Sequence, residues 1–329
     1  MRDAFDTVWV RKPWLRHLLA TVLLALLIWK VPAGKIWSIL KTTDPAPIGA
    51  AVAMILVARV LGAWRTKMLS DHQGLSFSLP RIFEIGCTST LYGMALPGSF
   101  SGGIVRWYRL SQPEHKRSEA FAVLSAERVV DFMVLALFGY SCLIAETIVV
   151  QLPLVAWGLA GVAVTCLLAL LVVFSEFGTT LDRLLHLDTP KAILRLPQVV
   201  LRISRRVVSD LLQFRNVGAG KLLVLLMVSL LLHIVATIAQ YQMAVSLGLD
   251  LTLVSIGWLR ACTVLLTTVP LTPSGLGIRE FSLVFLLLPF GVTAHEAVAF
   301  SLLQFGGMLL VVVLGAFLEA RRFLSVRPD

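Results

Sequence analysis

Charged residues are scarce in this sequence, and acidic residues are the scarcer kind. Only 15% of the 329 residues are charged, with 19 acidic against 29 basic side chains, whereas 57% are hydrophobic. The mean hydropathy is +0.86. A water-soluble globule carries about 25% charged residues, because its surface must be solvated. The composition therefore excludes a soluble enzyme and predicts an all-α, polytopic integral membrane protein.

Several kinds of site lack their signatures. The four cysteines, Cys87, Cys142, Cys166 and Cys262, lie in apolar segments without paired spacing, so neither a disulfide framework nor a zinc site is indicated. No GxxxxGK[ST] sequence is present, and no basic, aromatic-rich domain stands clear of the apolar runs. We therefore expect no cofactor, no metal and no nucleic-acid partner.

Long apolar runs predict about six full crossings within a single transmembrane domain, residues 1–329. A crossing helix needs roughly 20 apolar residues. Three runs are clear, and three are weaker because they are shorter or contain charges. In chain order the six are Leu15 to Val31, Ile48 to Trp64, Ala120 to Ala145, Leu154 to Phe174, Leu222 to Leu247 and Ala297 to Leu318.

Basic residues predict the orientation. Residues 178–220 read as a basic amphipathic loop, whereas the turns near Gln151 and Asp250 carry no Lys or Arg. Positive loops stay on the cytoplasmic side. This places the loop and both termini in the cytoplasm and the protein in the inner (cytoplasmic) membrane. Lys35 and Lys41 disagree, since they fall on the predicted outer side.

One Pro/Gly/Ser-rich segment occurs twice. PGSFSGGIVR at residues 97–106 reappears as PLTPSGLGIR at residues 270–279, and Glu119-Ala-Phe-Ala is matched by Glu296-Ala-Val-Ala. Such interruptions of apolar sequence are typical of broken helices in transporters. The residues expected to form the two loops are Pro97, Gly98, Ser101, Gly102, Gly103, Pro270, Pro273, Ser274, Gly275 and Gly277.

Counting crossings relates the two copies. Three predicted crossings separate them, and an odd number inverts the second copy relative to the first. We therefore expect inverted-topology repeats, approximately residues 79–147 and 251–320, each with a re-entrant hairpin. Irregular backbone at membrane depth needs protein or water to satisfy its polar groups, so a polar cavity is implied.

The charges inside apolar sequence suggest a binding site. Arg106 and Arg279 follow the glycine-rich loops at predicted helix starts, where a phosphate would be favoured. The alternative is that each arginine only neutralises a neighbouring acid, such as Glu280 beside Arg279.

Glu127, Arg128 and Asp131 share one helix segment. They would either meet a cationic headgroup or a coupling proton, or form a solvated helix start at the interface.

Other polar residues in apolar sequence have simpler explanations. Glu84, Arg59 and Arg260 lie near predicted boundaries, where snorkelling is the ordinary explanation. His233 reads as a neutral histidine hydrogen-bonded to a neighbouring helix, with a proton relay as the alternative.

The segments PGSFSGGIVR, AERVVDF at 126–132 and PLTPSGLGIREF at 270–281 together resemble the membrane region of lysylphosphatidylglycerol synthase/flippases and their stand-alone relatives. The resemblance extends from the second helix to the last. It implies movement of lipids between leaflets, with a headgroup cavity lined by Arg106, Glu127, Arg128, Asp131, Arg279 and Glu280. The chain ends at Asp329 without the soluble aminoacyl-transferase domain of full-length members, so lysyl transfer by this chain is not expected.

The leading hypothesis is therefore a lipid translocase rather than an enzyme. Its partner would be an anionic or zwitterionic phospholipid or a lipid-linked headgroup, with aminoacylated phosphatidylglycerol as one candidate. The alternatives are an integral-membrane transferase that acts on a lipid-linked donor and a scaffold for lipid synthesis. Whether the protein forms a homo-oligomer stays open.

Overall fold

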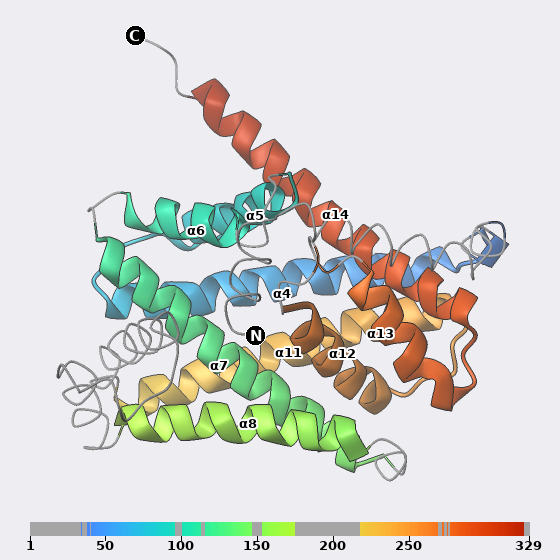
Figure 1. The fold of residues 1–329 in the computed structure, drawn as a ribbon. Coiled ribbons are helices and arrows are strands. Elements are labelled where there is room, and N and C mark those ends of the chain that lie inside the picture. Colours follow the sequence, from blue (N-terminus) through green and yellow to red (C-terminus); the bar gives the residue numbers. More distant parts are fainter. Residues whose placement is uncertain are drawn as a thin grey trace, which may run out of the picture.

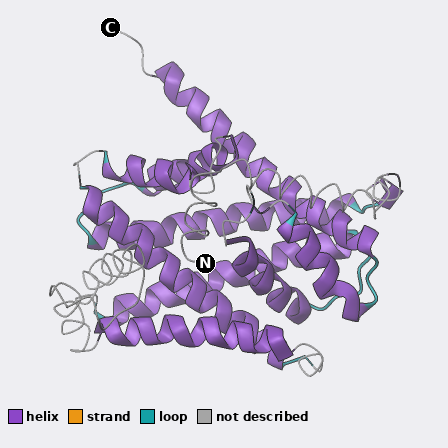
Figure 2. Ribbon diagram, in the orientation of Figure 1, coloured by secondary structure: helices purple, strands orange, loops and turns teal. Residues whose placement is uncertain are grey.

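A computed structural model describes residues 34, 38–39, 41–95, 101–112, 116–146, 153–174, 218–268, 272, 275 and 277–325. Within them the chain is helical and contains no strand (Figure 2). The helices are α4 (Pro45–His72), α5 (Leu79–Ala95), α6 (Ser101–Ser111), α7 (Arg117–Ile144), α8 (Pro153–Phe174), α11 (Ala219–Ser246), α12 (Leu253–Thr268), α13 (Ile278–Leu287), the 3-10 helix η3 (Leu288–Phe290) and α14 (Ala294–Ser325). The all-α expectation is confirmed for these residues.

Three helices are long and apolar enough to cross a membrane, namely α4, Gly220–Ser246 of α11 and Ala294–Arg322 of α14. Pro153–Leu168 of α8 and all of α12 are shorter apolar helices. The protein is thus embedded in a membrane, as the composition requires. The predicted first crossing and the basic loop up to residue 217 lie outside the described residues, so the number of crossings and their orientation remain predictions.

Local sequence explains where two of the long helices begin. Asp44 caps α4, because its side chain accepts a hydrogen bond of 3.0 Å from Ala46 N and Pro45 opens the helix. Thr293 and Glu296 cap α14 reciprocally: Glu296 Oε2 accepts from Thr293 N at 2.8 Å, and Thr293 Oγ1 accepts from Glu296 N at 3.4 Å. The repeated glutamate of the sequence therefore has a capping role here.

Helices α4 and α11 form an antiparallel pair through the middle of the bundle (Figure 1). Asp44 N, at the start of α4, donates to Ser246 O, at the end of α11, over 3.1 Å. Farther along, Gly62 of α4 faces Leu232 of α11. The two helices therefore run side by side for most of their length and give the other helices a common support.

Each copy of the repeated segment leads into the second of two short helices that pack against each other, α6 after α5 and α13 after α12. In the first pair Gly102 contacts Gly93 closely, and a Cβ at Gly102 would lie 2.6 Å from Ser89 O. Gly275 and Gly277 precede α13 with φ of 70° and 85°, a region that favours glycine. At about 1.5 Å per residue, the 11-residue α6 and the 10-residue α13 are too short to cross a bilayer.

Of the ten residues expected to form the two loops, the structure describes only some, and several of these belong to helices. Ser101, Gly102 and Gly103 form the first turn of α6, and Gly277 immediately precedes α13. Pro97, Gly98, Pro270, Pro273 and Ser274 lie outside the described residues. The re-entrant path of both loops therefore remains a prediction.

The helices α4 to α7, called the first half here, pack reciprocally against the helices α11 to α14, the second half. Helix α7 of the first half lies against α12, and α14 of the second half lies against α5. Small residues allow both approaches: a Cβ at Gly139 of α7 would lie 2.2 Å from Ala261 Cβ, and one at Gly315 of α14 would lie 2.5 Å from Cys87 O. Close helix packing through small residues is the usual way that membrane helices associate.

These contacts predict opposite effects for two glycines of α14. Gly315→Ala should lower the free energy of unfolding by about 1–3 kcal/mol, because its Cβ meets a backbone carbonyl that cannot move aside. Gly306→Ala should raise it by about 0.5–1 kcal/mol, since nothing lies within 4 Å and alanine favours the helix. Thermal unfolding in detergent would measure both, and equal behaviour of the two variants would contradict the α5–α14 packing.

Candidate functional site

A cavity of about 560 Å³ opens among α4, α5, α6, α7, α11, α12 and α14. Its wall is apolar in part, with Ile55, Phe83, Leu232, Met243 and Val264, and strongly charged elsewhere. The charged residues in the lining are Arg59, Arg65, Arg106, Glu127, Arg128, Asp131 and Arg260, joined by the polar His233, Gln240 and Gln304. Such a mixture of apolar wall and converging polar groups is typical of a ligand site.

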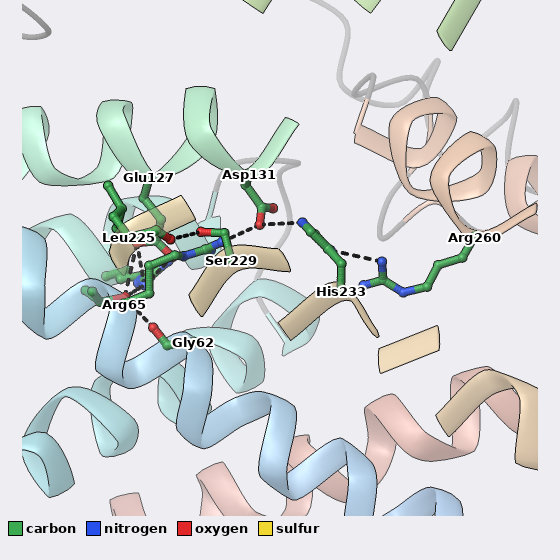
Figure 3. Close-up of polar contacts among 10 residues, drawn as sticks. Gly62, Arg65, Glu127, Asp131, Leu225, Ser229, His233 and Arg260 are labelled. Atoms are coloured by element: carbon green, nitrogen blue, oxygen red, sulfur yellow. Dashed lines mark hydrogen bonds and ion pairs between the residues drawn. The ribbon is translucent and has the colours of Figure 1, made fainter. Parts of the chain in front are cut away.

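Two carboxylates of α7 meet one arginine of α4 at the edge of this cavity. Glu127 and Asp131 are four residues apart and therefore lie on the same helix face. Arg65 donates to Glu127 Oε1 at 3.0 Å and to Asp131 Oδ1 at 2.5 Å (Figure 3). Arg65 and Glu127 are 5% and 6% exposed, so the pairing compensates charges that would otherwise be buried alone.

Arg106 extends the cluster from the first short-helix pair. Its Nη2 donates to Glu127 Oε2 at 2.8 Å and to Thr66 Oγ1 at 2.6 Å. Arg106 is thus placed by α4 and α7 together. Because Arg65 and Arg106 both bind Glu127, the carboxylate holds α6 against the central helix pair.

His233 continues the chain of contacts to α12. Arg260 Nη1 lies 3.1 Å from His233 Nδ1, and His233 Nε2 lies 3.3 Å from Asp131 Oδ1 (Figure 3). A guanidinium can only donate, which assigns Nδ1 as the acceptor and leaves the ring proton on Nε2, facing the carboxylate. The ring is therefore neutral and bonded to a neighbouring helix, as expected from the sequence.

Arg59 and Arg128 complete the charged lining without a carboxylate partner among the described residues. Arg59 lies halfway along α4. The guanidinium of Arg128 lies 5.7 Å from the centroid of the Phe132 ring. Arg260, which contacts His233, likewise forms no direct ion pair with an acid in the described part of the chain. The lining therefore holds five arginines against two carboxylates, a formal charge of +3 with His233 neutral.

The structure brings together four of the six residues expected to line a headgroup cavity, Arg106, Glu127, Arg128 and Asp131. Arg279 and Glu280 are not part of this lining. Arg279 Nη2 instead donates to Glu280 Oε1 at 2.7 Å, and its guanidinium lies 5.4 Å from the Phe305 ring centroid. The arrangement of Arg279 corresponds to the alternative in which the arginine neutralises its neighbour.

Glu280 is also held by its own helix start. Gly277 N donates to Glu280 Oε2 at 2.7 Å, and Ser301 Oγ donates to Glu280 Oε1 at 2.7 Å. With 3% exposure, the carboxylate is buried where α13 meets α14. These contacts give the Arg279–Glu280 pair a structural role in the second half of the chain.

Sequence reasoning missed part of the site. Arg65, which follows directly after an apolar run, was not among the residues that the sequence singled out, and snorkelling was the explanation given for Arg59 and Arg260. The three arginines line the cavity instead. The available signal was the cost of an arginine inside an apolar run, which favours an inward-facing position. Glu84 is paired locally, since Arg81 Nη1 donates to it at 2.7 Å.

A second ion pair ties the first short-helix pair to α14. Arg109 Nη2 donates to both carboxylate oxygens of Glu319, at 2.6 and 2.8 Å, and Arg109 Nη1 donates to Thr88 Oγ1 at 2.8 Å. The Arg109 guanidinium also lies 5.5 Å from the Tyr92 ring centroid. This pairing joins α6, α5 and α14.

As for metals, the described residues contain no group of three or more His, Cys, Asp or Glu that could hold an ion.

Breaking the central pair should destabilise the protein strongly. Arg65→Gln should lower the free energy of unfolding by about 3–5 kcal/mol, because it leaves buried carboxylates undercompensated. Glu127 keeps Arg106, so Arg65→Gln combined with Asp131→Asn should regain part of the loss. Lys67→Gln is the matched control, since Lys67 forms a more exposed pair with Asp71 and should change stability by less than about 1 kcal/mol. Detergent melting curves would test this, and a wild-type midpoint for Arg65→Gln would contradict it.

The family described as the lysylphosphatidylglycerol synthase TM region matches residues 14–316. A search of curated proteins found no match. The family match spans α4 to α14, all the elements that form the cavity, and it confirms the resemblance read from the repeated loops and the α7 motif. This all-helical membrane chain therefore belongs to the lysylphosphatidylglycerol synthase transmembrane-region family.

Proposed function

We propose that this protein is a lipid translocase, which moves a phospholipid or a lipid-linked headgroup between the leaflets of the cytoplasmic membrane. The observation that carries the proposal is the arginine-rich cavity inside a bundle of apolar helices. Charges at membrane depth are costly and are typical of substrate pathways. A phosphate-bearing headgroup would enter the cavity, while its acyl chains stay among the apolar helix surfaces.

The size of the cavity supports this assignment. About 560 Å³ is within the range of roughly 300–1,000 Å³ found for small-ligand pockets. It suits a polar headgroup but is too small for a whole phospholipid with two acyl chains. Exposed apolar side chains such as Leu56, Val60 and Leu231 on α4 and α11 would lie against lipid. The division of one lipid between cavity and bilayer follows from these two surfaces.

We also propose that the two halves are inverted repeats. Each repeat would include one more helix than the sequence-based ranges 79–147 and 251–320, because α4 and α11 belong to them. In chain order, α4 to α7 correspond to α11 to α14: a long helix, two short ones and a second long one. The antiparallel α4–α11 pair and the reciprocal α7–α12 and α14–α5 contacts support a pseudo-two-fold relation. In this arrangement the short-helix pairs would be re-entrant from opposite sides, and each half would open the cavity to one leaflet in turn.

A membrane-embedded transferase is less well supported. It would need a general base beside the phosphate. Glu127 is bonded to Arg65 and Arg106, and Asp131 Oδ1 is bonded to Arg65 and lies 3.3 Å from His233 Nε2, so both candidate bases are already engaged. Their contacts fit a role in building the cavity wall.

Filling the cavity should stop transport without removing any charge. Ala236 of α11 lines the cavity, so Ala236→Trp should reduce lipid movement in proteoliposomes to the rate of protein-free liposomes. The readout is the chemical quenching of an acyl-labelled fluorescent phospholipid in the outer leaflet. Ala53→Trp is the matched control, since Ala53 is exposed on α4 outside the cavity.

The control variant should transport at the wild-type rate. Equal transport by the wild type and Ala236→Trp would show that this cavity is not the pathway. No lipid movement by the wild type in any vesicle tested would overturn the translocase assignment itself.

A further inference from the structure

The charges of the cavity are not evenly compensated. Glu127 and Asp131 of α7 are bonded to Arg65, with Arg106 and His233 completing their contacts. No acid in the described part of the chain forms a direct ion pair with Arg59, Arg128 or Arg260, although Arg260 reaches the cluster through His233. The cavity wall therefore combines a balanced cluster with three surplus cations.

The three surplus arginines come from different helices and converge on one space. Arg59 lies on α4, Arg128 on α7 and Arg260 on α12, and all three line the cavity. Arg260 is held by its contact with His233, and Arg128 lies beside the Phe132 ring. A guanidinium carries five N–H donors and no acceptor, in a planar fork that matches phosphate oxygens. The site thus offers positive charge and donors to whatever enters it.

An incoming ammonium group would find little to bind. Both oxygens of Glu127 are taken by Arg65 and Arg106, and Asp131 Oδ1 is shared by Arg65 and His233. Asp131 Oδ2 is the one carboxylate oxygen of the lining left for an ammonium, and the formal charge of +3 on the lining opposes the entry of a further cation. Neutral Gln240 and Gln304 remain in the lining and can bond to headgroup hydroxyls.

We propose that the cavity selects lipids whose headgroup carries a net negative charge and no ammonium group, such as a phosphate diester of a polyol. Arg59, Arg128 and Arg260 would determine this selectivity by binding the phosphate. Aminoacylated phosphatidylglycerol, which bears an added ammonium, would be discriminated against at this site. The inference rests on the proposed lipid function but concerns binding, so it can be tested without transport.

The experiment uses the full chain in detergent and measures binding of acyl-labelled phosphatidylglycerol at constant salt. Unlabelled phosphatidylglycerol should compete at least roughly tenfold better than lysylphosphatidylglycerol of the same acyl length, the ratio expected when one charged contact is lost. Phosphatidylethanolamine should fall between the two. Glycerol phosphate, a soluble competitor, should be much weaker than the lipid.

Variants connect the selectivity to the arginines. Arg59→Gln should weaken phosphatidylglycerol binding roughly tenfold or more, because a charged hydrogen bond is removed. The difference in affinity between phosphatidylglycerol and lysylphosphatidylglycerol should become smaller in this variant. Arg59→Lys should restore part of the affinity. Arg321→Gln, at an exposed position at the end of α14, is the matched control and should bind as the wild type does. Arg128→Gln repeats the test from α7 in case the Arg59 variant is misfolded.

Three results would overturn the proposal. The first is that lysylphosphatidylglycerol competes as well as phosphatidylglycerol or better. The second is that Arg59→Gln and Arg128→Gln bind phosphatidylglycerol as tightly as Arg321→Gln does. The third is that glycerol phosphate competes as strongly as phosphatidylglycerol. Selective binding in detergent without lipid movement in liposomes would support the charge selectivity and reject the translocase function. Movement of lysylphosphatidylglycerol as fast as phosphatidylglycerol would support the translocase function and reject the charge selectivity.

Discussion

The pairing of Arg65 with Glu127 and Asp131 is the interaction on which the rest of the site depends. A bilayer cannot solvate an isolated carboxylate, so the two acids of α7 must meet cations within the protein. Arg65 supplies one from α4 and Arg106 supplies another from α6, while the neutral ring of His233, on α11, lies 3.3 Å from Asp131 Oδ1. The charges of α7 therefore fix the relative positions of four helices, and the cavity forms beside them.

Close helix contacts make this arrangement possible. Gly139 and Gly315 let α7 approach α12 and α14 approach α5 without an intervening side chain. Since apolar helices gain little from hydrophobic burial inside a membrane, such contacts and the buried ion pairs supply much of the specificity of packing. The cavity lies beside a packed apolar core to which α4, α7, α11, α12, α13 and α14 all contribute. The ion pair between Arg109 and Glu319 adds a further contact, which joins α6 to α14.

The two copies of the repeated loop have diverged in what their arginines do. Arg106 follows the first loop and bonds to Glu127 of α7. Counting from the matching Glu119 and Glu296, the position equivalent to Glu127 in α14 is Gln304, a neutral residue. Arg279 therefore has no such carboxylate on the facing helix, and it pairs with adjacent Glu280. The cavity is thus asymmetric in charge although the helices of the two halves follow the same order.

The sequence by itself determined the membrane class, most of the helices, the duplicated break and the family. Each depends on local composition or on motifs such as AERVVDF, which can be read without knowing what lies nearby. Only the tertiary structure decided which arginines share the cavity. Arg65 and Asp131 are 66 residues apart, and Arg260 reaches the cluster through His233 of another helix. A charge in an apolar run signals that a partner is needed, but the partner is chosen by how the helices pack.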